Sequence, residues 1–225
     1  MDLIKSYDFF KPESCSDRIH IIGCGAVGST VAENLVRFGL TNMTIYDFDT
    51  VESRNIANQM FRTIDIGKPK TQALAEILTE INPELEGKLT IEPEGYHGQR
   101  LNGYVFLCVD NIDLRREIAT ANKGNPYIKA MFDFRIRLED AQHYAADWHN
   151  PKMVNNFLAT MQFSHEEAKK ETQVSACNVE LSVAPTVRQI CALGVSNFIN
   201  FVKSGCKDIK KMILASAFAF DIQAF

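Results

Sequence analysis

The segment Ile19-His20-Ile21-Ile22-Gly23-Cys24-Gly25-Ala26-Val27-Gly28 is the strongest indication of the fold. Its first four residues form an apolar run that ends at a glycine, which is typical of a buried parallel strand. From Ala26 to Phe38 apolar residues recur at helical spacing, and Gly39 then provides a C-terminal cap. The order strand, glycine loop, helix predicts the first βα unit of a Rossmann-type fold.

The glycine loop also predicts a site for nucleotide phosphates. Gly23 permits the tight turn, and Gly25 lets a phosphate approach the backbone. Gly28 lets the helix pack close to the sheet, while the amides of Ala26 and Val27 face the anion from the helix N-terminus. A tight turn that binds no ligand is the alternative.

Asp47 is the expected acidic partner of the loop. It lies in a second predicted strand over residues 43–49, nineteen residues after Gly28, where a carboxylate can accept hydrogen bonds from ribose hydroxyls. We expect Asp49 to belong to the same shell. ATP and NAD both present a ribose and phosphates, so these residues do not separate the two nucleotides.

Strands and helices alternate along the first half of the chain. Helices are predicted over 71–81 and 112–123, strands over 89–91 and 104–109, and a further strand over 127–137, where the alternation ends. This alternation predicts an α/β fold of the Rossmann type, with a mostly parallel sheet and helices on both faces.

Beyond residue 125 we expect one or two extra strands and helices packed onto the same core. The length favours one domain over residues 1–225, with a nucleotide-binding half at about 18–125. Residues 164–173 are polar and predict a mobile segment, and residues 212–220 predict a last strand. Residues 187–202 form a helix so apolar that it must be buried, either inside the domain or in a homodimer interface.

Composition excludes several classes of function. The chain has 225 residues and a net charge of -4 without a long run of one sign, which argues against nucleic acid or an anionic membrane as a partner. No apolar stretch approaches the roughly 20 residues of a membrane helix, and the first residues do not resemble a secretory signal. Six cysteines without CxxC spacing predict reduced thiols in a cytoplasmic protein and no four-cysteine zinc site.

Further motifs follow the second strand, and with the glycine loop they form a specific series: Asp47-Phe48-Asp49-Thr50-Val51, Asn55, Asp65-Ile66-Gly67-Lys68-Pro69-Lys70, Asn82-Pro83 and Asp110-Asn111. The series resembles the ThiF/MoeB/HesA family, bacterial relatives of ubiquitin-activating enzymes. Members of that family adenylate the C-terminal glycine carboxylate of a small ubiquitin-like protein. The resemblance is dense over residues 18–116 and thin beyond them.

The resemblance implies ATP and Mg²⁺ as ligands, a ubiquitin-like or sulfur-carrier protein as partner, and a homodimer. Lys70 would supply a cation to the phosphates, and Asn55 would bind a phosphate oxygen. Asp110 would hold Mg²⁺, which prefers carboxylate oxygen, with Asn111 beside it in the nucleotide site. As alternatives, Lys70 is an exposed lysine at a helix start, and Asp110-Asn111 is a cap for the following helix.

Cys177 lies roughly where many family members place a reactive cysteine, so a thioester-forming role is implied for it. The alternative is a small buried hydrophobic residue.

The sequence also departs from the family pattern. Asn58 stands where the family usually has an arginine that touches the phosphates, with Arg54 or Arg62 as candidate substitutes, and the first seventeen residues contain no arginine. These departures keep a non-catalytic nucleotide-binding scaffold open as a second hypothesis. An NAD-dependent oxidoreductase is a third, although no residue stands out as its hydride-transfer acid.

Overall fold

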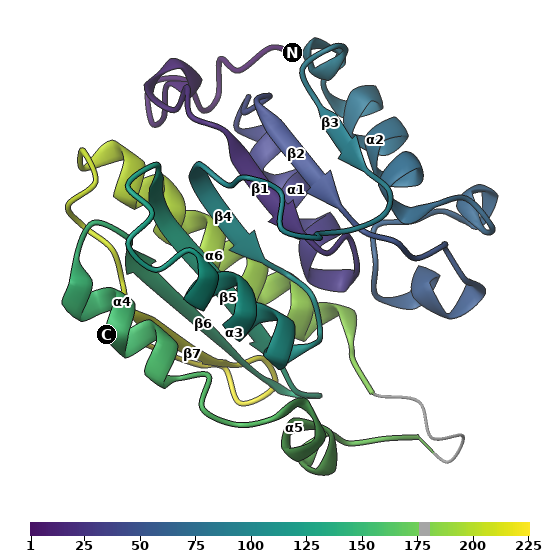
Figure 1. Ribbon diagram of the computed structural model, residues 1–225. Coiled ribbons are helices and arrows are strands. Elements are labelled where there is room, and N and C mark those ends of the chain that lie inside the picture. The colour runs from purple at the N-terminus through teal and green to yellow at the C-terminus, as the bar shows by residue number, and fades with distance from the viewer. Residues whose placement is uncertain (176–180) are drawn as a thin grey trace.

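Within residues 1–175 and 181–225, which the computed structural model describes, eight strands form one sheet in the order β3-β2-β1-β4-β5-β6-β7-β8 (Figure 1). The first five strands in this order pair in parallel: β3 (Thr90–Glu92), β2 (Met43–Tyr46), β1 (Ile19–Ile22), β4 (Gly103–Leu107) and β5 (Ile128–Ile136). The remaining three add in antiparallel fashion: β6 (Asp140–Asp147), β7 (Met212–Ser216) and β8 (Asp221–Ala224).

Helices cover both faces of this sheet (Figure 1). One face carries α1 (Ala26–Arg37), α2 (Lys70–Ile81) and α6 (Ala184–Lys203), and the other carries α3 (Ile112–Ala121) and α4 (Pro151–Ala159). In the first layer, the ring of Phe198 lies edge-on to Phe106 and Phe132, at centroid distances of 5.4 and 5.6 Å. The predicted α/β architecture with helices on both faces is therefore confirmed.

Short 3-10 helices connect these elements in the described residues: η1 (Pro12–Ser14), η2 (Ser53–Ala57), η3 (Thr63–Asp65) and η4 (Pro83–Leu85). None of the helices in the described part of the chain has the length and apolar character needed to cross a membrane.

Helix α6 is buried by its own chain. The side chains of Val187, Ile190 and Cys191 are fully buried, and the helix packs on α1 and on strands β5 to β7. A second copy is not needed to cover it. The apolar character of residues 187–202 therefore gives no argument for a homodimer, and the alternative of a place in the domain core is the correct one.

Two expectations for the second half were wrong. In the described chain four strands lie beyond residue 125, not one or two extra ones, and the strand expected over 212–220 ends at Ser216 and is followed by a further strand, β8. Residues 164–173 also contain a helix, α5 (His165–Glu171), that the polar sequence did not predict. Its cause is a capping box, in which Ser164 Oγ accepts from the Glu167 amide and the Glu167 carboxylate accepts from the Ser164 amide.

The strand order fixes where a ligand can bind. The chain runs from β1 outward to β2 and β3, and then returns to place β4 on the other side of β1. In open α/β sheets such a switch in direction leaves a crevice at the carboxyl ends of the two strands concerned. Here these are the ends of β1 and β4, where the glycine loop and Asp110 follow.

Candidate nucleotide site

The glycine loop is held tightly against the end of β4. Gly23 has a φ of 98°, and its amide donates to Tyr46 O at 2.8 Å. A Cβ on Gly23 would lie 2.8 Å from the backbone of Cys108, and one on Gly28 would lie 1.8 Å from Gly23 O. Neither position can therefore carry a side chain without moving the backbone.

Gly25 faces open space instead. A Cβ added there would meet no atom within 4 Å in the described chain. Gly25 is also the N-cap of α1, and no side chain caps this end of the helix. Unpaired amides and the positive end of the helix dipole favour an anion here. The loop formed by Gly23, Gly25, Ala26, Val27 and Gly28 thus has one open side, at Gly25, where an anion can approach the backbone.

Asp47 joins the end of β2 to the glycine loop. Its Oδ2 accepts from the Cys24 amide at 2.6 Å, and its Oδ1 accepts from the Asp49 amide at 2.8 Å. Burial raises the pKa of this carboxyl, which the two backbone amides and the positive charge of Lys70 partly oppose. Each oxygen keeps a further lone pair, so a ribose hydroxyl can still donate to it.

Lys70 and Asp49 form an ion pair beside Asp47. Lys70 begins α2, its side chain is buried, and its Nζ lies 2.7 Å from Asp49 Oδ2. The Asp49 side chain remains about half exposed, at 52%. A buried cation at a helix N-terminus is unfavourable by itself, and Asp49 offsets its charge. Lys70 is therefore not the exposed lysine of the alternative interpretation, and the contact of Lys70 and Asp49 with a nucleotide stays a prediction.

Asp65 fixes the turn that carries Lys70, a role that the sequence motif did not reveal. Asp65 is fully buried, and it accepts from Arg62 Nε at 2.9 Å and from Lys68 Nζ at 3.3 Å. The hydrogen bonds from Arg62 hold the pKa of the Asp65 carboxyl at about 2. The Lys70 amide then donates to Asp49 O at 2.8 Å, which fixes the direction of the lysine.

Asp110 and Asn111 follow β4, but only Asn111 makes the hydrogen bonds that cap α3. Asn111 is the N-cap of α3, and its Oδ1 accepts from the Asp113 and Leu114 amides at 2.9 and 3.2 Å. Asp110 is exposed. Asn111 therefore caps the helix. The Asp110 carboxylate is not needed for capping and is free to bind a ligand.

Asn55 lies in η2, where its Oδ1 accepts from the Glu52 amide at 2.8 Å. Its place in the site stays a prediction. The two candidate substitutes for the absent arginine are already paired: Arg54 with Glu52 at 2.8 Å, and Arg62 with Asp65 and Glu80.

Cys177 lies outside the described residues, so its role also stays a prediction. Four of the described cysteines, Cys15, Cys24, Cys108 and Cys191, are buried, and burial raises the pKa of each thiol. A thiol with a raised pKa is a poor nucleophile. These four residues therefore pack as small hydrophobic side chains.

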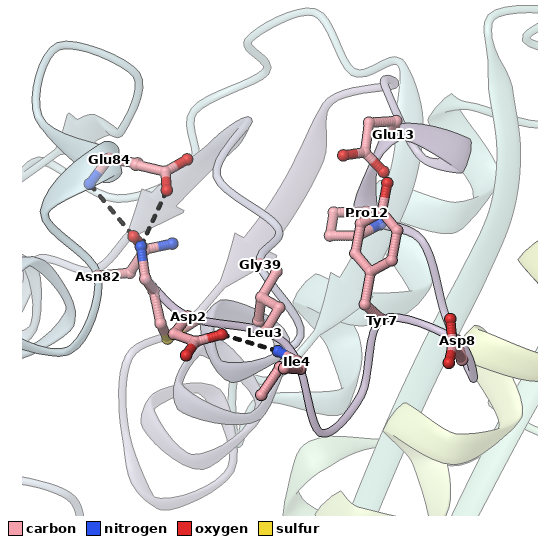
Figure 2. A pocket seen from close by; sticks show the side chains of 11 residues that line it. Asp2, Leu3, Ile4, Tyr7, Asp8, Pro12, Glu13, Gly39, Asn82 and Glu84 are labelled. Carbon is pink, nitrogen blue, oxygen red and sulfur yellow. Dashed lines mark hydrogen bonds and ion pairs between the residues drawn. The ribbon is translucent and has the colours of Figure 1, made fainter.

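A cavity of about 600 Å³ lies between the N-terminal segment and the C-terminal ends of α1 and α2, away from the glycine loop (Figure 2). Carboxylates dominate its polar lining, among them Asp2, Glu13 and Glu84. Such a lining repels phosphates. The glycine loop, and not this cavity, is therefore the candidate site for a nucleotide.

Curated relatives share part of this chain. The chain is 38% identical over 85 residues to "Ubiquitin-like modifier-activating enzyme 5" of Arabidopsis thaliana, covering 38% of this chain and 19% of that protein. It is 29% identical over 122 residues to "Molybdopterin-synthase adenylyltransferase" of Escherichia coli (strain K12), covering 52% of this chain and 49% of that protein. The chain thus spans less than half the length of these relatives.

A solved structure shares the fold. The chain superposes on the crystal structure of E. coli MccB with ATP with a TM-score of 0.74 and 15% sequence identity, covering 95% of this chain and 65% of that one. The model of the ThiF family matches residues 13–225. The chain therefore belongs to the ThiF family.

Proposed function

We propose that this chain binds ATP with Mg²⁺ and adenylates a carboxylate, namely the C-terminus of a ubiquitin-like or sulfur-carrier protein. One observation supports the proposal: in a chain of the ThiF family, the open side of the glycine loop, the buried Lys70 and the exposed Asp110 lie at the carboxyl ends of the neighbouring strands β2, β1 and β4. The printed names of the relatives support the activity, since they include an adenylyltransferase and ubiquitin-like modifier-activating enzymes.

Adenylation of a carboxylate requires neutralisation of phosphate charge and alignment of the reactants, but no general base. A carboxylate is ionised at neutral pH and can attack the α-phosphorus directly. The new acyl-phosphate bond forms as the bond to pyrophosphate breaks, and negative charge builds on the phosphate oxygens. Backbone amides of the glycine loop and the ammonium of Lys70 would stabilise that charge. Asp47 would orient the ribose, with Asp49 holding Lys70 in place.

The protein side chains at this site can bind Mg²⁺ only together with the phosphates of a nucleotide. Magnesium is usually held by one or two carboxylates together with substrate phosphates and waters. In residues 1–175 and 181–225, no three His, Cys, Asp or Glu side chains gather closely enough to hold a metal ion by themselves. The exposed carboxylate of Asp110 next to the glycine loop matches that pattern, so Asp110 would hold the ion and the ion would neutralise phosphate charge.

Exchange of labelled pyrophosphate into ATP, dependent on the carrier, tests the proposal. Lys70→Ala and Asp110→Ala should each lower the exchange rate by about a hundredfold, because each removes one electrostatic contact to the transition state. Lys152→Ala is the matched control, since Lys152 also follows a proline in the first turn of a helix, α4, and is exposed. Carrier-dependent exchange that survives in both site variants would contradict the proposal.

A nucleotide-binding scaffold without catalysis is the second candidate. It is favoured by Asn58 at the family's arginine position and by the ion pairs that occupy Arg54 and Arg62. Binding of ATP without exchange, in the presence of the true carrier, would select it.

Assembly and location are also proposals. A homodimer rests on the family resemblance alone. A cytoplasmic location is supported by five unpaired cysteines in the described part of the chain.

A further inference from the structure

The turn after β4 is held by a buried arginine from α3. Arg115 is 6% exposed, and its Nε donates to Val109 O at 2.6 Å while its Nη2 donates to the same oxygen. Its Nη1 donates to Phe134 O at 2.5 Å and to Asp133 Oδ1 at 2.8 Å. One guanidinium therefore links the carbonyl next to Asp110 to two residues of β5.

Asp133 keeps Arg115 in this position. Asp133 is fully buried, and its second oxygen accepts from Arg135 Nε at 2.7 Å. Arg135 in turn donates to the backbone oxygen and to Oγ1 of Thr160, at 2.7 and 2.8 Å, and lies over the ring of Tyr144. Asp133 and Arg135 thus form a salt bridge.

The bonds to Val109 matter because the β-ladder has already ended there. The Cys108 amide still donates to Ile22 O at 2.8 Å, but β4 itself ends at Leu107. Val109 is half-buried, and its carbonyl, which lies beyond the end of the strand, accepts hydrogen bonds from Arg115. The side chain thereby sets the backbone direction immediately before Asp110.

We propose that Arg115 is a positioning residue of the nucleotide site, which fixes the Val109-Asp110 turn and so the placement of the Asp110 carboxylate. This inference rests on the proposed function. Magnesium demands near-ideal octahedral geometry, so a displaced carboxylate loses the metal–nucleotide complex before it loses the nucleotide. Lysine in place of Arg115 keeps the charge opposite Asp133 but cannot reproduce the planar fork that reaches several acceptors at once.

Calorimetric titration with an ATP analogue that carries a methylene bridge between the α and β phosphorus atoms, with and without Mg²⁺, tests this role. The wild type should bind more tightly with Mg²⁺. Arg115→Lys should lose about tenfold or more of the affinity measured with Mg²⁺, and keep the affinity measured without it. A purely structural role for Arg115 would lower both affinities together.

Arg116→Lys is the matched control. Arg116 is the next residue of α3, and its guanidinium also binds two carbonyls, of Met161 and Phe163 at 3.0 and 2.9 Å, as well as the carboxylate of Asp113 at 2.6 Å. It does not contact Val109 in the described structure. This control should retain the full response to Mg²⁺.

The outcomes separate the two proposals. A wild type that binds no nucleotide overturns the proposed function, and the role of Arg115 with it. A wild type that responds to Mg²⁺ and an Arg115→Lys variant that responds equally overturn the role of Arg115 alone. If circular dichroism shows that Arg115→Lys is unfolded, Asp133→Asn replaces it. That variant weakens the hold on Arg115, so a reduced response to Mg²⁺ supports the role and a full response overturns it.

Discussion

At the scale of single residues, the glycine loop combines two different constraints. Gly28 is required by packing, since a Cβ there would lie 1.8 Å from Gly23 O, whereas Gly25 faces open space. We expect Gly28→Ala to lower the free energy of unfolding by about 2 kcal/mol or more, and Gly25→Ala to change it by less than about 0.5 kcal/mol. Urea denaturation measures both values.

The Gly25→Ala variant should separate ATP affinity from the stability of the fold. Gly25→Ala places a methyl group where a phosphate would approach, so ATP affinity should fall although the fold is intact. Equal ATP affinity in Gly25→Ala and wild type would show that the phosphates bind elsewhere.

His143 makes the stability of the chain depend on pH. It is fully buried, stacked on Phe132, and it contacts Asp133 O and Asn197 Nδ2 at 3.1 Å each. Burial lowers the pKa of His143 to about 4, from an ordinary value of 6.5. The unfolded chain therefore binds this proton at a higher pH than the folded chain does. The stability that the neutral imidazole provides is complete above about pH 6.5 and is lost as the pH falls toward about 4.

The expected loss across that interval is about 3 kcal/mol. Urea unfolding at a series of pH values should show it in the wild type, and His143→Gln should flatten the curve between pH 6.5 and 4. An unchanged slope in the variant would assign the pH dependence to another group.

The buried contacts of the site also show which of its features can be predicted from the sequence and which cannot. Asp47 and Lys70 could be placed from the sequence because motif spacing and strand ends are local properties. The pairing of Asp133 with Arg115 could not, because it joins a helix to a neighbouring strand and depends on how the two pack. The ion pair between Lys70 and Asp49 cannot be predicted for the same reason, because it joins the start of α2 to the loop after β2.

At the scale of elements, the junction between β4 and α3 contributes both to stability, through the cap of α3, and to the candidate site, through Asp110. Asn111 caps α3, and Asn150 caps α4 with the same geometry, accepting from the Lys152 and Met153 amides at 3.1 and 3.2 Å. Asn111→Ala and Asn150→Ala should each lower the free energy of unfolding by about 1 kcal/mol. Only Asn111→Ala should also weaken ATP binding in the presence of Mg²⁺, because Asn111 follows Asp110 directly. Equal effects of the two variants on binding would remove Asn111 from the site.

Elements with a strong periodic pattern were predicted well, and weak patterns were not. Helix α1 and strand β1 have marked apolar periodicity and clear end signals. Strand β6 turns Ala141, His143 and Ala145 toward the core, and such small or polar side chains hide the alternation. Helix α5 was missed although Ser164 and Glu167 form a recognisable capping box, because no apolar face accompanies it.

At the scale of the whole molecule, ligand binding should raise stability by mass action. ATP with Mg²⁺ at 100 times its dissociation constant should add about 2.7 kcal/mol to the free energy of unfolding. NAD at the same concentration should not, if the site binds a triphosphate through Lys70 and Asp110. Thermal denaturation with each nucleotide is the measurement, and stabilisation by NAD alone would favour an oxidoreductase.

The order of strands has a consequence for how the chain can assemble while it is being synthesised. β2 and then β3 extend the sheet on one side of β1, and β4 to β8 extend it on the other side in the order of translation. No strand of the described chain has to be inserted between two that are already paired. Each strand emerging from the ribosome can therefore dock on an edge of the sheet that exists when it arrives, whereas α6, which packs on α1, joins the first half only after β6 has been made.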